Sequence, residues 1–556
     1  MFEWIFICGI FFAFYNAWGI GANDCANSFA TSVGSGVLTL KKAVIIASIF
    51  EFLGAVLMGS HVTDMVRKKI VEIDIFKSNP GALMFGMLCA DLSSAIWLTV
   101  ATYFKLPVST THSIIGAIVG FSLAFGGSDA VNWNKIGLVV ASWIASPFIA
   151  GIFSLCTFYL LNRFCFQKKD SFRRITFLFP GITFFTFFIN SLFIIYKGSP
   201  QLELDELPFW QCFVISSGIS IVTAIISKYV YLPYAIRKIK KNNENNNDSN
   251  LESQNDSNIE SQNDSNIESQ NTIILRELED NESVVDESSL VRRTKSYLES
   301  NIGDNGNNLN IEEFKNSNEN SEENSNENSK ENSEELYNNF EYDKSKNIND
   351  NILRSRKYVK KLEELKKQKE IETHHKNADL IDKDSEQLCH WIQIITACFS
   401  SFAHGSNDVA NAIAPLATIY HIYRYNEITK KADIPIWILV LGGLGIVIGL
   451  ATWGYKIIDR IGKEITKISA SRGFIIELSA ALTVIIASRS EIPVSTTHCQ
   501  VGSIVGCGLV GGNKNIKWSL LKNIVMSWVI TLPVTGLLSA GLFSYGYYSP
   551  NELNQI

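Results

Sequence analysis

Residues 106–120 read LPVSTTHSIIGAIVG, and residues 492–506 read IPVSTTHCQVGSIVG. The two stretches share a proline, three hydroxyl side chains in a row and a histidine, followed by apolar residues and glycines. Ser109 and Ser495, at the same place in each stretch, stand 386 positions apart. A single recurrence can arise by chance. A duplicated fold is indicated only if other parts of the chain also repeat at the same distance.

Two more motifs repeat in the same order and at nearly the same distance. GANDCANSFAT at 21–31 is matched by GSNDVANAIAP at 405–415, and the Ser-Trp and Pro of ASWIASP (141–147) return in MSWVITLP (526–533). Three motifs in one order indicate an internal duplication. Duplicated halves are typical of membrane transporters, and halves with an odd number of crossings have inverted topologies.

Long apolar stretches flank a charged centre. The stretch at 137–161 has no charged residue over 25 positions, and about 20 apolar residues in a helix cross a bilayer core. We expect the opening MFEWIFICGIFF to be a retained first span rather than a secretory signal, because it lacks a basic leader and a cleavage site. The sequence therefore predicts an all-α polytopic protein of the cell membrane. Candidate spans lie near 3–22, 43–65, 82–104, 111–126, 136–161, 175–196, 210–236, 390–420, 434–458, 470–488, 494–512 and 520–547.

The chain divides into four parts by composition. An N-terminal membrane half (1–240) and a C-terminal one (389–549) flank a segment at 241–388 that is rich in Asn, Ser and Glu, and a tail follows at 550–556. The central segment repeats NDSNIESQ and cannot bury enough apolar surface to fold, so we predict disorder. Basic residues flank the adjoining spans, and they favour a cytosolic loop. They include Arg237, Lys238, Lys240 and Lys241.

Charge and cysteine content exclude some classes of partner. The net charge of −6, from 49 basic and 55 acidic residues, belongs mostly to the central segment, and no basic face suited to nucleic acid is present. The ten cysteines lie in or beside apolar stretches without a C-x-x-C motif. We therefore interpret them as packing thiols rather than as metal ligands or a disulfide framework.

The ND-x-AN motif places an acid in an apolar environment in each half. An ionised Asp near the bilayer centre costs about 2.5–3.5 kcal/mol and persists with a function or a partner. The alternative is a structural carboxylate at a helix break, which the presence of two copies disfavours. On a helix the two Asn side chains of each copy share a face, so we expect them to point together beside the Asp. The candidates are Asn23, Asp24 and Asn27, and Asn407, Asp408 and Asn411.

The PVSTTH phrase predicts a helix start. Pro107 and Pro493 suit the first turn of a helix. Hydroxyls just inside that start would surround free backbone N–H groups, which together can hold a tetrahedral anion. The alternative is a hydroxyl cap bonded to its own backbone. His112 and His498 are interpreted as packed core residues. The candidate anion ligands are Ser109, Thr110 and Thr111, and Ser495, Thr496 and Thr497.

Further acids interrupt the apolar stretches. Glu51 and Glu477 are each followed by the hydroxyl phrase of their half, so we treat them as counterparts, and Asp91 is a third such acid. An anion held between the two hydroxyl phrases would also lie near Asp24 and Asp408, and like charges repel strongly where the dielectric constant is low. Cations must therefore enter with it, and carboxylate and amide oxygens suit Na⁺ or a proton. Binding that is mutually dependent in this way is the basis of symport.

At these motifs the sequence resembles the inorganic phosphate transporter (PiT) family of sodium- or proton-coupled phosphate symporters. The resemblance covers roughly 1–236 and 390–547 and leaves out the insert. It implies two inverted-topology repeats with about twelve helical segments, re-entrant helical hairpins and a homodimer. It also implies a phosphate site at Asp24, Asp408 and the two Ser-Thr-Thr runs, and sodium as coupling ion with no other cofactor. The implied sodium ligands are Asn23, Asp24, Asn27, Glu51, Asn407, Asp408, Asn411 and Glu477.

Competing interpretations are weaker. A membrane-embedded hydrolase using Ser109 or Ser495 with the nearby His lacks a G-x-S-x-G or H-E-x-x-H motif, so we predict that the protein is not an enzyme. A proton-coupled symporter, a phosphate receptor or a channel on the same scaffold would share these motifs. Because these alternatives share the same motifs, measurements of transport are needed to separate them.

Overall fold

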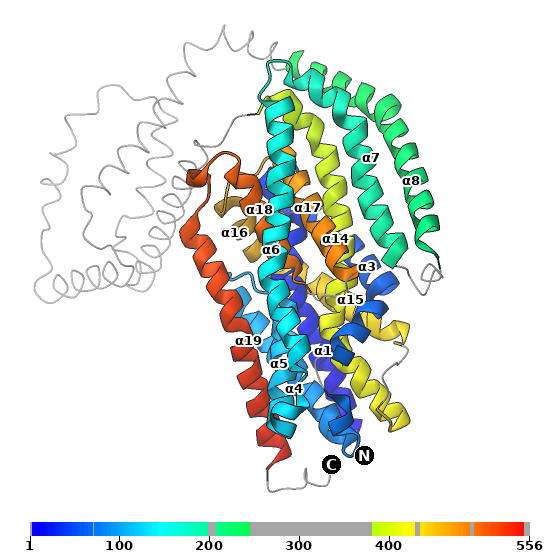
Figure 1. Ribbon diagram of the computed structural model, residues 1–556, viewed down its shortest axis with the longest axis vertical. Helices are drawn as coiled ribbons and strands as arrows, with labels where there is room; N and C mark the ends of the chain where they lie inside the picture. The colour runs from blue at the N-terminus through cyan, green and yellow to red at the C-terminus, as the bar shows by residue number, and fades with distance from the viewer. Residues whose placement is uncertain are drawn as a thin grey trace, which may run out of the picture. The chain divides into compact units, whose positions relative to one another are not determined.

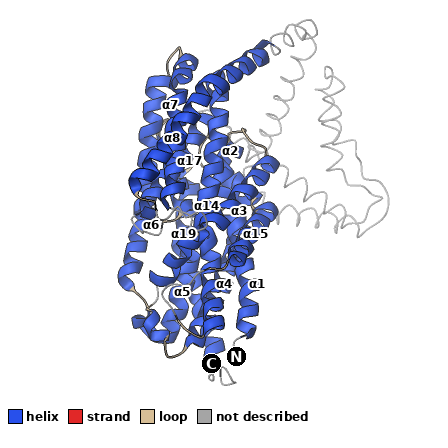
Figure 2. Ribbon diagram, turned by 90° about the vertical axis from the view of Figure 1, so that its right-hand side faces the viewer, coloured by secondary structure: helices blue, strands red, loops and turns tan. Residues whose placement is uncertain are grey.

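The computed structural model describes residues 3–69, 72–197, 207–244, 381–428, 434–489 and 494–549. Within these ranges every long regular element is a helix (Figure 2). Most of the segment predicted to be a disordered loop, and the tail at 550–556, lie outside the described residues. The described residues up to Ile239 and those of the C-terminal half form one compact unit.

The described part of the N-terminal half contains helices α1 to α8, and α-helical structure continues after α8 at residues 232–244. The first, α1, begins at Glu3 and buries Ile5, Gly9 and Ala13, so the opening segment is part of the packed core. Helices α7 and α8 form an antiparallel pair, and none of the described helices of the other half corresponds to them. The elements are α1 (Glu3–Asn23), α2 (Ala26–Gly34), α3 (Leu40–Lys69), α4 (Pro80–Tyr103), α5 (Thr110–Gly126), α6 (Trp133–Leu161), α7 (Ser171–Lys197) and α8 (Phe209–Ile226).

The C-terminal half repeats the order of the first six helices, except that one pair of helices is joined into one and one helix is split into two. Helix α14 takes the place of α1 and α2, and α15 with α16 takes the place of α3. The elements are α14 (Lys383–Tyr425), α15 (Ile436–Trp453), α16 (Tyr455–Glu464), α17 (Ala470–Arg489), α18 (Thr496–Leu509) and α19 (Trp518–Tyr547).

Helices of each half pack against helices of the other half. Helix α1 packs on α15 and α14 packs on α3, while α5 packs on α19 and α18 packs on α6. In Figure 1, α6 runs upward and its counterpart α19 runs downward to the C-terminus, so the two copies have opposite directions. This packing brings the duplicated motifs of both halves to the centre of one unit.

Nine helices of the described part are long and apolar enough to cross a membrane. The other predicted segments also form helices, but α14 and α17 carry more polar residues, and α18 has only 14 residues. A 14-residue helix is about 21 Å long, which is shorter than the roughly 30 Å hydrocarbon core. Helix α18 alone is therefore too short to cross the hydrocarbon core. Apolar side chains such as Phe148, Phe177 and Leu537 are 69%, 84% and 75% exposed, as expected for a lipid-facing surface.

Close backbone contact between α3 and α14 depends on glycine. A Cβ atom added to Gly405 would lie 2.2 Å from the backbone oxygen of Glu51, and one added to Gly54 would lie 2.1 Å from that of Phe402. Small residues at helix crossings let backbones approach closely in membranes. This contact places Glu51 directly beside the ND-x-AN motif of the other half.

Candidate functional site

The ND-x-AN motif of the N-terminal half lies at a helix break. Helix α1 ends at Asn23 and α2 begins at Ala26, so Asp24 sits between two helix ends. The Asp24 and Cys25 backbone N–H groups both donate to the Ile20 carbonyl, at 2.8 and 3.3 Å. Asp24 is 1% exposed and Asp408, inside α14, is fully buried.

Threonine hydroxyls from both halves donate to the two acids. Thr110 Oγ1 donates to Asp24 Oδ2 at 2.9 Å, and Thr497 Oγ1 donates to Asp24 Oδ1. Thr496 Oγ1 donates to Asp408 Oδ2 at 3.0 Å, and Thr110 Oγ1 lies 3.5 Å from Asp408 Oδ1. We call these residues, together with Asn27 and Asn411, the acid–hydroxyl cluster.

The second Asn of each motif links its own acid to the hydroxyl phrase of the opposite half. Asn27 Nδ2 donates to Asp24 Oδ1 at 2.6 Å and to Thr497 Oγ1 at 3.0 Å. Asn411 Nδ2 donates to Asp408 Oδ1 at 2.9 Å and to Thr111 Oγ1 at 3.2 Å. The duplication thus produces the same pair of contacts twice, once across each junction between the halves.

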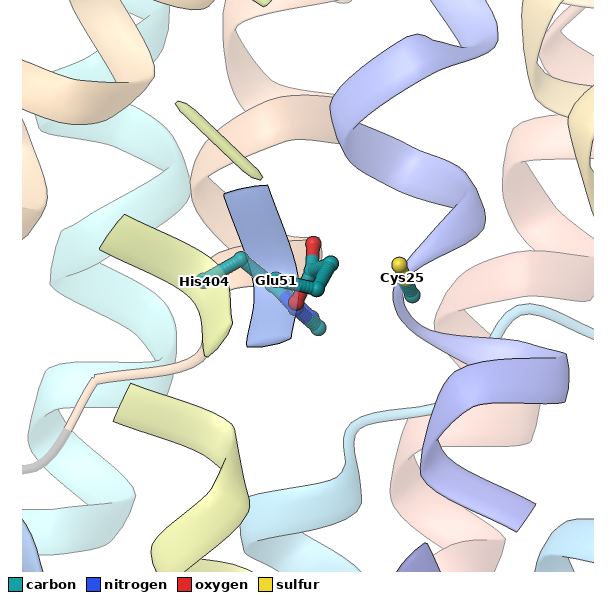
Figure 3. Close-up of side chains that lie close together, drawn as sticks. All are labelled: Cys25, Glu51 and His404. Atoms are coloured by element: carbon teal, nitrogen blue, oxygen red, sulfur yellow. The ribbon is translucent and has the colours of Figure 1, made fainter. Parts of the chain in front are cut away.

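A buried histidine that the sequence interpretation missed lies among the acids. His404 Nδ1 is 2.9 Å from Glu51 Oε2, and His404 Nε2 is 2.9 Å from Asp408 Oδ2 and 3.8 Å from Asp24 Oδ1. Figure 3 shows His404 beside Glu51, with Cys25 across from both. One signal could have revealed it: His404 stands four residues before Asp408 and so shares its helix face.

Glu477 lies in a separate set of hydroxyls. Thr31 Oγ1 and Ser32 Oγ donate to Glu477 Oε1, and Thr396 Oγ1 donates to Oε2. Glu477 is 1% exposed. Helix α2 carries Asn27 of the acid–hydroxyl cluster as well as Thr31 and Ser32, so this nine-residue helix connects both acid sites.

The prediction that Asn23 and Asn27 point together is wrong. Asn23 Nδ2 donates to Thr102 Oγ1 and to the Leu106 carbonyl, both at 2.9 Å, and its Oδ1 accepts from Val108 N. The helix break rotates Asn23 away from Asp24, where it holds the segment that precedes α5. Asn407 is partly exposed and takes no part in the hydrogen bonds of the acid–hydroxyl cluster.

The pairing of Glu51 with Glu477 as counterparts is also wrong. Glu477 stands 18 residues before Ser495, and the acid at the same distance before Ser109 is Asp91. Asp91 and Glu477 lie on α4 and α17, which each precede the hydroxyl-phrase helix, whereas Glu51 lies on α3. Glu51 joins the acid–hydroxyl cluster through His404 instead.

The serine of each hydroxyl phrase is a helix cap. Ser109 Oγ accepts from His112 N, and Ser495 Oγ accepts from His498 N, both at 3.3 Å. Helix α5 begins at Thr110, so Pro107 precedes it and does not occupy its first turn, while Pro493 lies outside the described residues. His112 and His498 pack with ring centroids 4.5 Å apart, in agreement with the core interpretation.

The arrangement gathers several negative charges around a few donors. Three buried acids, Asp24, Glu51 and Asp408, share one imidazole that can carry at most one positive charge. Buried charges persist when they are paired or bind cations. The cluster therefore has ligands for small hard cations in its carboxylate, amide and hydroxyl oxygens, and two helix starts, of α5 and α18, that suit an anion.

Known proteins match this chain over both halves. Residues 20–539 match the Phosphate transporter family. Sodium-dependent phosphate transporter 1 of Mus musculus is 31% identical over 98% of this chain and 95% of its own length. The protein of the same name from Homo sapiens is 32% identical over 98% and 96%. A solved structure described as the sodium-dependent phosphate transporter is 27% identical, covers 97% of this chain and 98% of its own, and has a TM-score of 0.65.

Proposed function

Because the chain belongs to the phosphate transporter family, we propose that it carries inorganic phosphate into the cell together with sodium ions. Sodium is the coupling ion, and the protein needs no other cofactor and is a transporter rather than an enzyme. The observation that carries the proposal is the acid–hydroxyl cluster, in which the duplicated motifs of both halves converge on Asp24 and Asp408.

Phosphate would bind between the starts of α5 and α18. The hydroxyls of Thr110, Thr111, Thr496 and Thr497 would donate to its oxygens, with free N–H groups of the first turns beside them. Ser109 and Ser495 would act by fixing those first turns, since their oxygens already cap the helices.

Sodium would bind the carboxylates, and this explains the coupling. Thr110 donates to Asp24 and Thr496 to Asp408, so the acids occupy hydroxyls that phosphate needs. A sodium ion on each acid neutralises it and releases the hydroxyl to turn toward the anion. Asn27 and Asn411 contribute amide groups at the same acids, Glu51 joins them through His404, and Glu477 supplies a separate cation position.

Two finer points belong to the same proposal. The central segment faces the cytosol, which is supported by basic residues at the end of the preceding span, among them Arg237 and Lys238. The protein forms a homodimer, which is an expectation from the family resemblance.

Uptake of radioactive phosphate into proteoliposomes tests the proposal. Uptake should require an inward sodium gradient and should stop when choline replaces sodium. Phosphate uptake that is unchanged in choline would reject sodium coupling.

One observation favours proton coupling as a second candidate. His404 lies within 2.9 Å of both Glu51 and Asp408, and an imidazole exchanges protons in the physiological pH range. An inward proton gradient imposed in choline separates the two, because only a proton-coupled carrier would then accumulate phosphate.

A further inference from the structure

The duplication gives Glu477 a counterpart in the N-terminal half, and that counterpart has different surroundings. Asp91 lies on α4 and is fully buried. Glu477 accepts hydroxyl hydrogen bonds at both of its oxygens. Asp91 accepts a single hydrogen bond, and its donor is an amide: Asn16 Nδ2 donates to Asp91 Oδ1 at 3.0 Å. Asp91 Oδ2 is buried without a hydrogen-bond partner.

Asn16 has a matching unpaired oxygen. Its Nδ2 donates to Asp91 Oδ1 and, at 3.3 Å, to the backbone carbonyl of Asn411, while its Oδ1 is buried and unpaired. Both neighbours of the amide nitrogen are acceptors, so a flipped amide would place oxygen against oxygen, and this fixes its orientation. The pair thus holds two buried acceptor oxygens that lack donors.

Either a cation or a proton could satisfy this pair, and the two differ in the charge that they leave on Asp91. A proton on Asp91 Oδ2 would join the two oxygens in one hydrogen bond and neutralise the acid, whereas a cation would bind both oxygens and keep the carboxylate ionised. None of the ion pairs among the described residues includes Asp91. One carboxylate with neutral amide and carbonyl oxygens matches a hard cation of single charge, and the proposed function makes sodium the available one.

We propose that Asp91 and Asn16, from α4 and α1, form a further sodium site that is separate from the acid–hydroxyl cluster and adds one sodium ion to each phosphate carried. This inference rests on the proposed function. The Asn411 carbonyl, which accepts from Asn16, belongs to the same residue whose side chain donates to Asp408 and Thr111. An ion at Asp91 is thereby coupled to the phosphate site through Asn411.

The ratio of sodium to phosphate entering proteoliposomes tests the site. Both solutes are labelled and their initial uptake rates are measured together for the full chain and for Asp91→Asn, which keeps the shape and removes the charge. We expect the variant to transport phosphate with one sodium ion fewer per phosphate and with a less steep dependence on sodium concentration. Asp129→Asn, at an exposed acid of the same half, is the matched control and should keep the wild-type ratio.

Asn16→Leu provides a second variant in case Asp91→Asn fails to insert, and it should lower the ratio in the same direction. An unchanged ratio in inserted, active Asp91→Asn or Asn16→Leu protein would overturn the site. Loss of an accompanying proton flux with an unchanged sodium ratio would also overturn it and would make Asp91 a proton carrier. If the wild-type protein takes up phosphate without sodium, the proposed function itself fails. Because that measurement uses the wild type alone, it is independent of the test of the Asp91 site.

Discussion

In the N-terminal half the ND-x-AN motif straddles the break between α1 and α2, whereas in the C-terminal half the same motif lies inside the uninterrupted α14. The position four residues before the acid is Ile20 in the first copy and His404 in the second. Asp24 is consequently bonded to hydroxyls and an amide, while Asp408 also has an imidazole nitrogen at 2.9 Å.

Exposure separates the two copies as well. Among the residues predicted to form the site, Asn407 and Thr496 are the partly exposed ones, and both belong to the C-terminal half. The N-terminal copy is fully enclosed. A repeated motif therefore fixes which ligand side chains are available. The local backbone and the neighbouring side chains determine which contacts each copy makes.

Removing either acid should have the largest effect. Asp24→Asn and Asp408→Asn each delete a buried charge that the cluster uses, and disrupting such a group costs about 3–5 kcal/mol. We expect each to lower sodium-dependent phosphate uptake at least about 100-fold, as measured in proteoliposomes with equal amounts of inserted protein. Wild-type uptake in either variant would mean that its half does not contribute an acid to the site.

Substituting the first Asn of each ND-x-AN motif should affect stability differently in the two copies. Asn23→Ala removes three hydrogen bonds, two of them buried, that hold the segment before α5, and leaving buried groups unpaired costs about 1–3 kcal/mol. We expect a clear fall in the thermal unfolding temperature in detergent. Asn407→Ala is the matched control and should unfold at nearly the wild-type temperature, so equal shifts would contradict the difference drawn between the copies.

His404→Gln should reveal the role of the imidazole, which the N-terminal copy lacks. Protonated His404 places a positive charge beside Glu51 and Asp408, so acidification should raise the sodium concentration needed for half-maximal uptake in the wild type. A single competing proton can produce up to about a tenfold rise per pH unit. We expect His404→Gln to flatten this dependence, and His421→Gln, further along α14, to leave it unchanged. An identical pH profile in His404→Gln would exclude the imidazole as a competitor.

Deleting residues 245–350, which join the two halves, should have the smallest effect. The composition of this segment offers no site chemistry. We expect uptake within roughly twofold of the wild type, measured per molecule at the membrane. A larger loss would show that the link between the halves contributes to turnover.

The sequence predicts much of the fold because apolar length and repetition are direct signals. The helices, the duplication and the convergence of Asp24, Asp408 and the Thr side chains follow from them. The helix break at Asp24 was not predictable in the same way, because the two motifs have nearly the same local sequence. The structure nevertheless ends α1 at Asn23 and continues α14 through Asn407.

The correct partners of the acids also depend on three-dimensional contacts. Glu51 reaches the acid–hydroxyl cluster only because Gly405 and Gly54 allow α3 and α14 to touch. Order along the chain suggested pairing Glu51 with Glu477, although equal spacing to the hydroxyl phrase points to Asp91. The spacing of four residues to Asp408 is the one sequence signal for His404, and it does not reveal the contact with Glu51 on another helix.

Binding of labelled phosphate to the purified protein, with and without sodium, tests the central claim most directly. The account predicts that sodium raises phosphate affinity by about 5- to 150-fold, the range of typical coupling between sites, and that phosphate raises sodium affinity by the same factor. Equal phosphate affinity in sodium and in choline, at every pH tested, would contradict it.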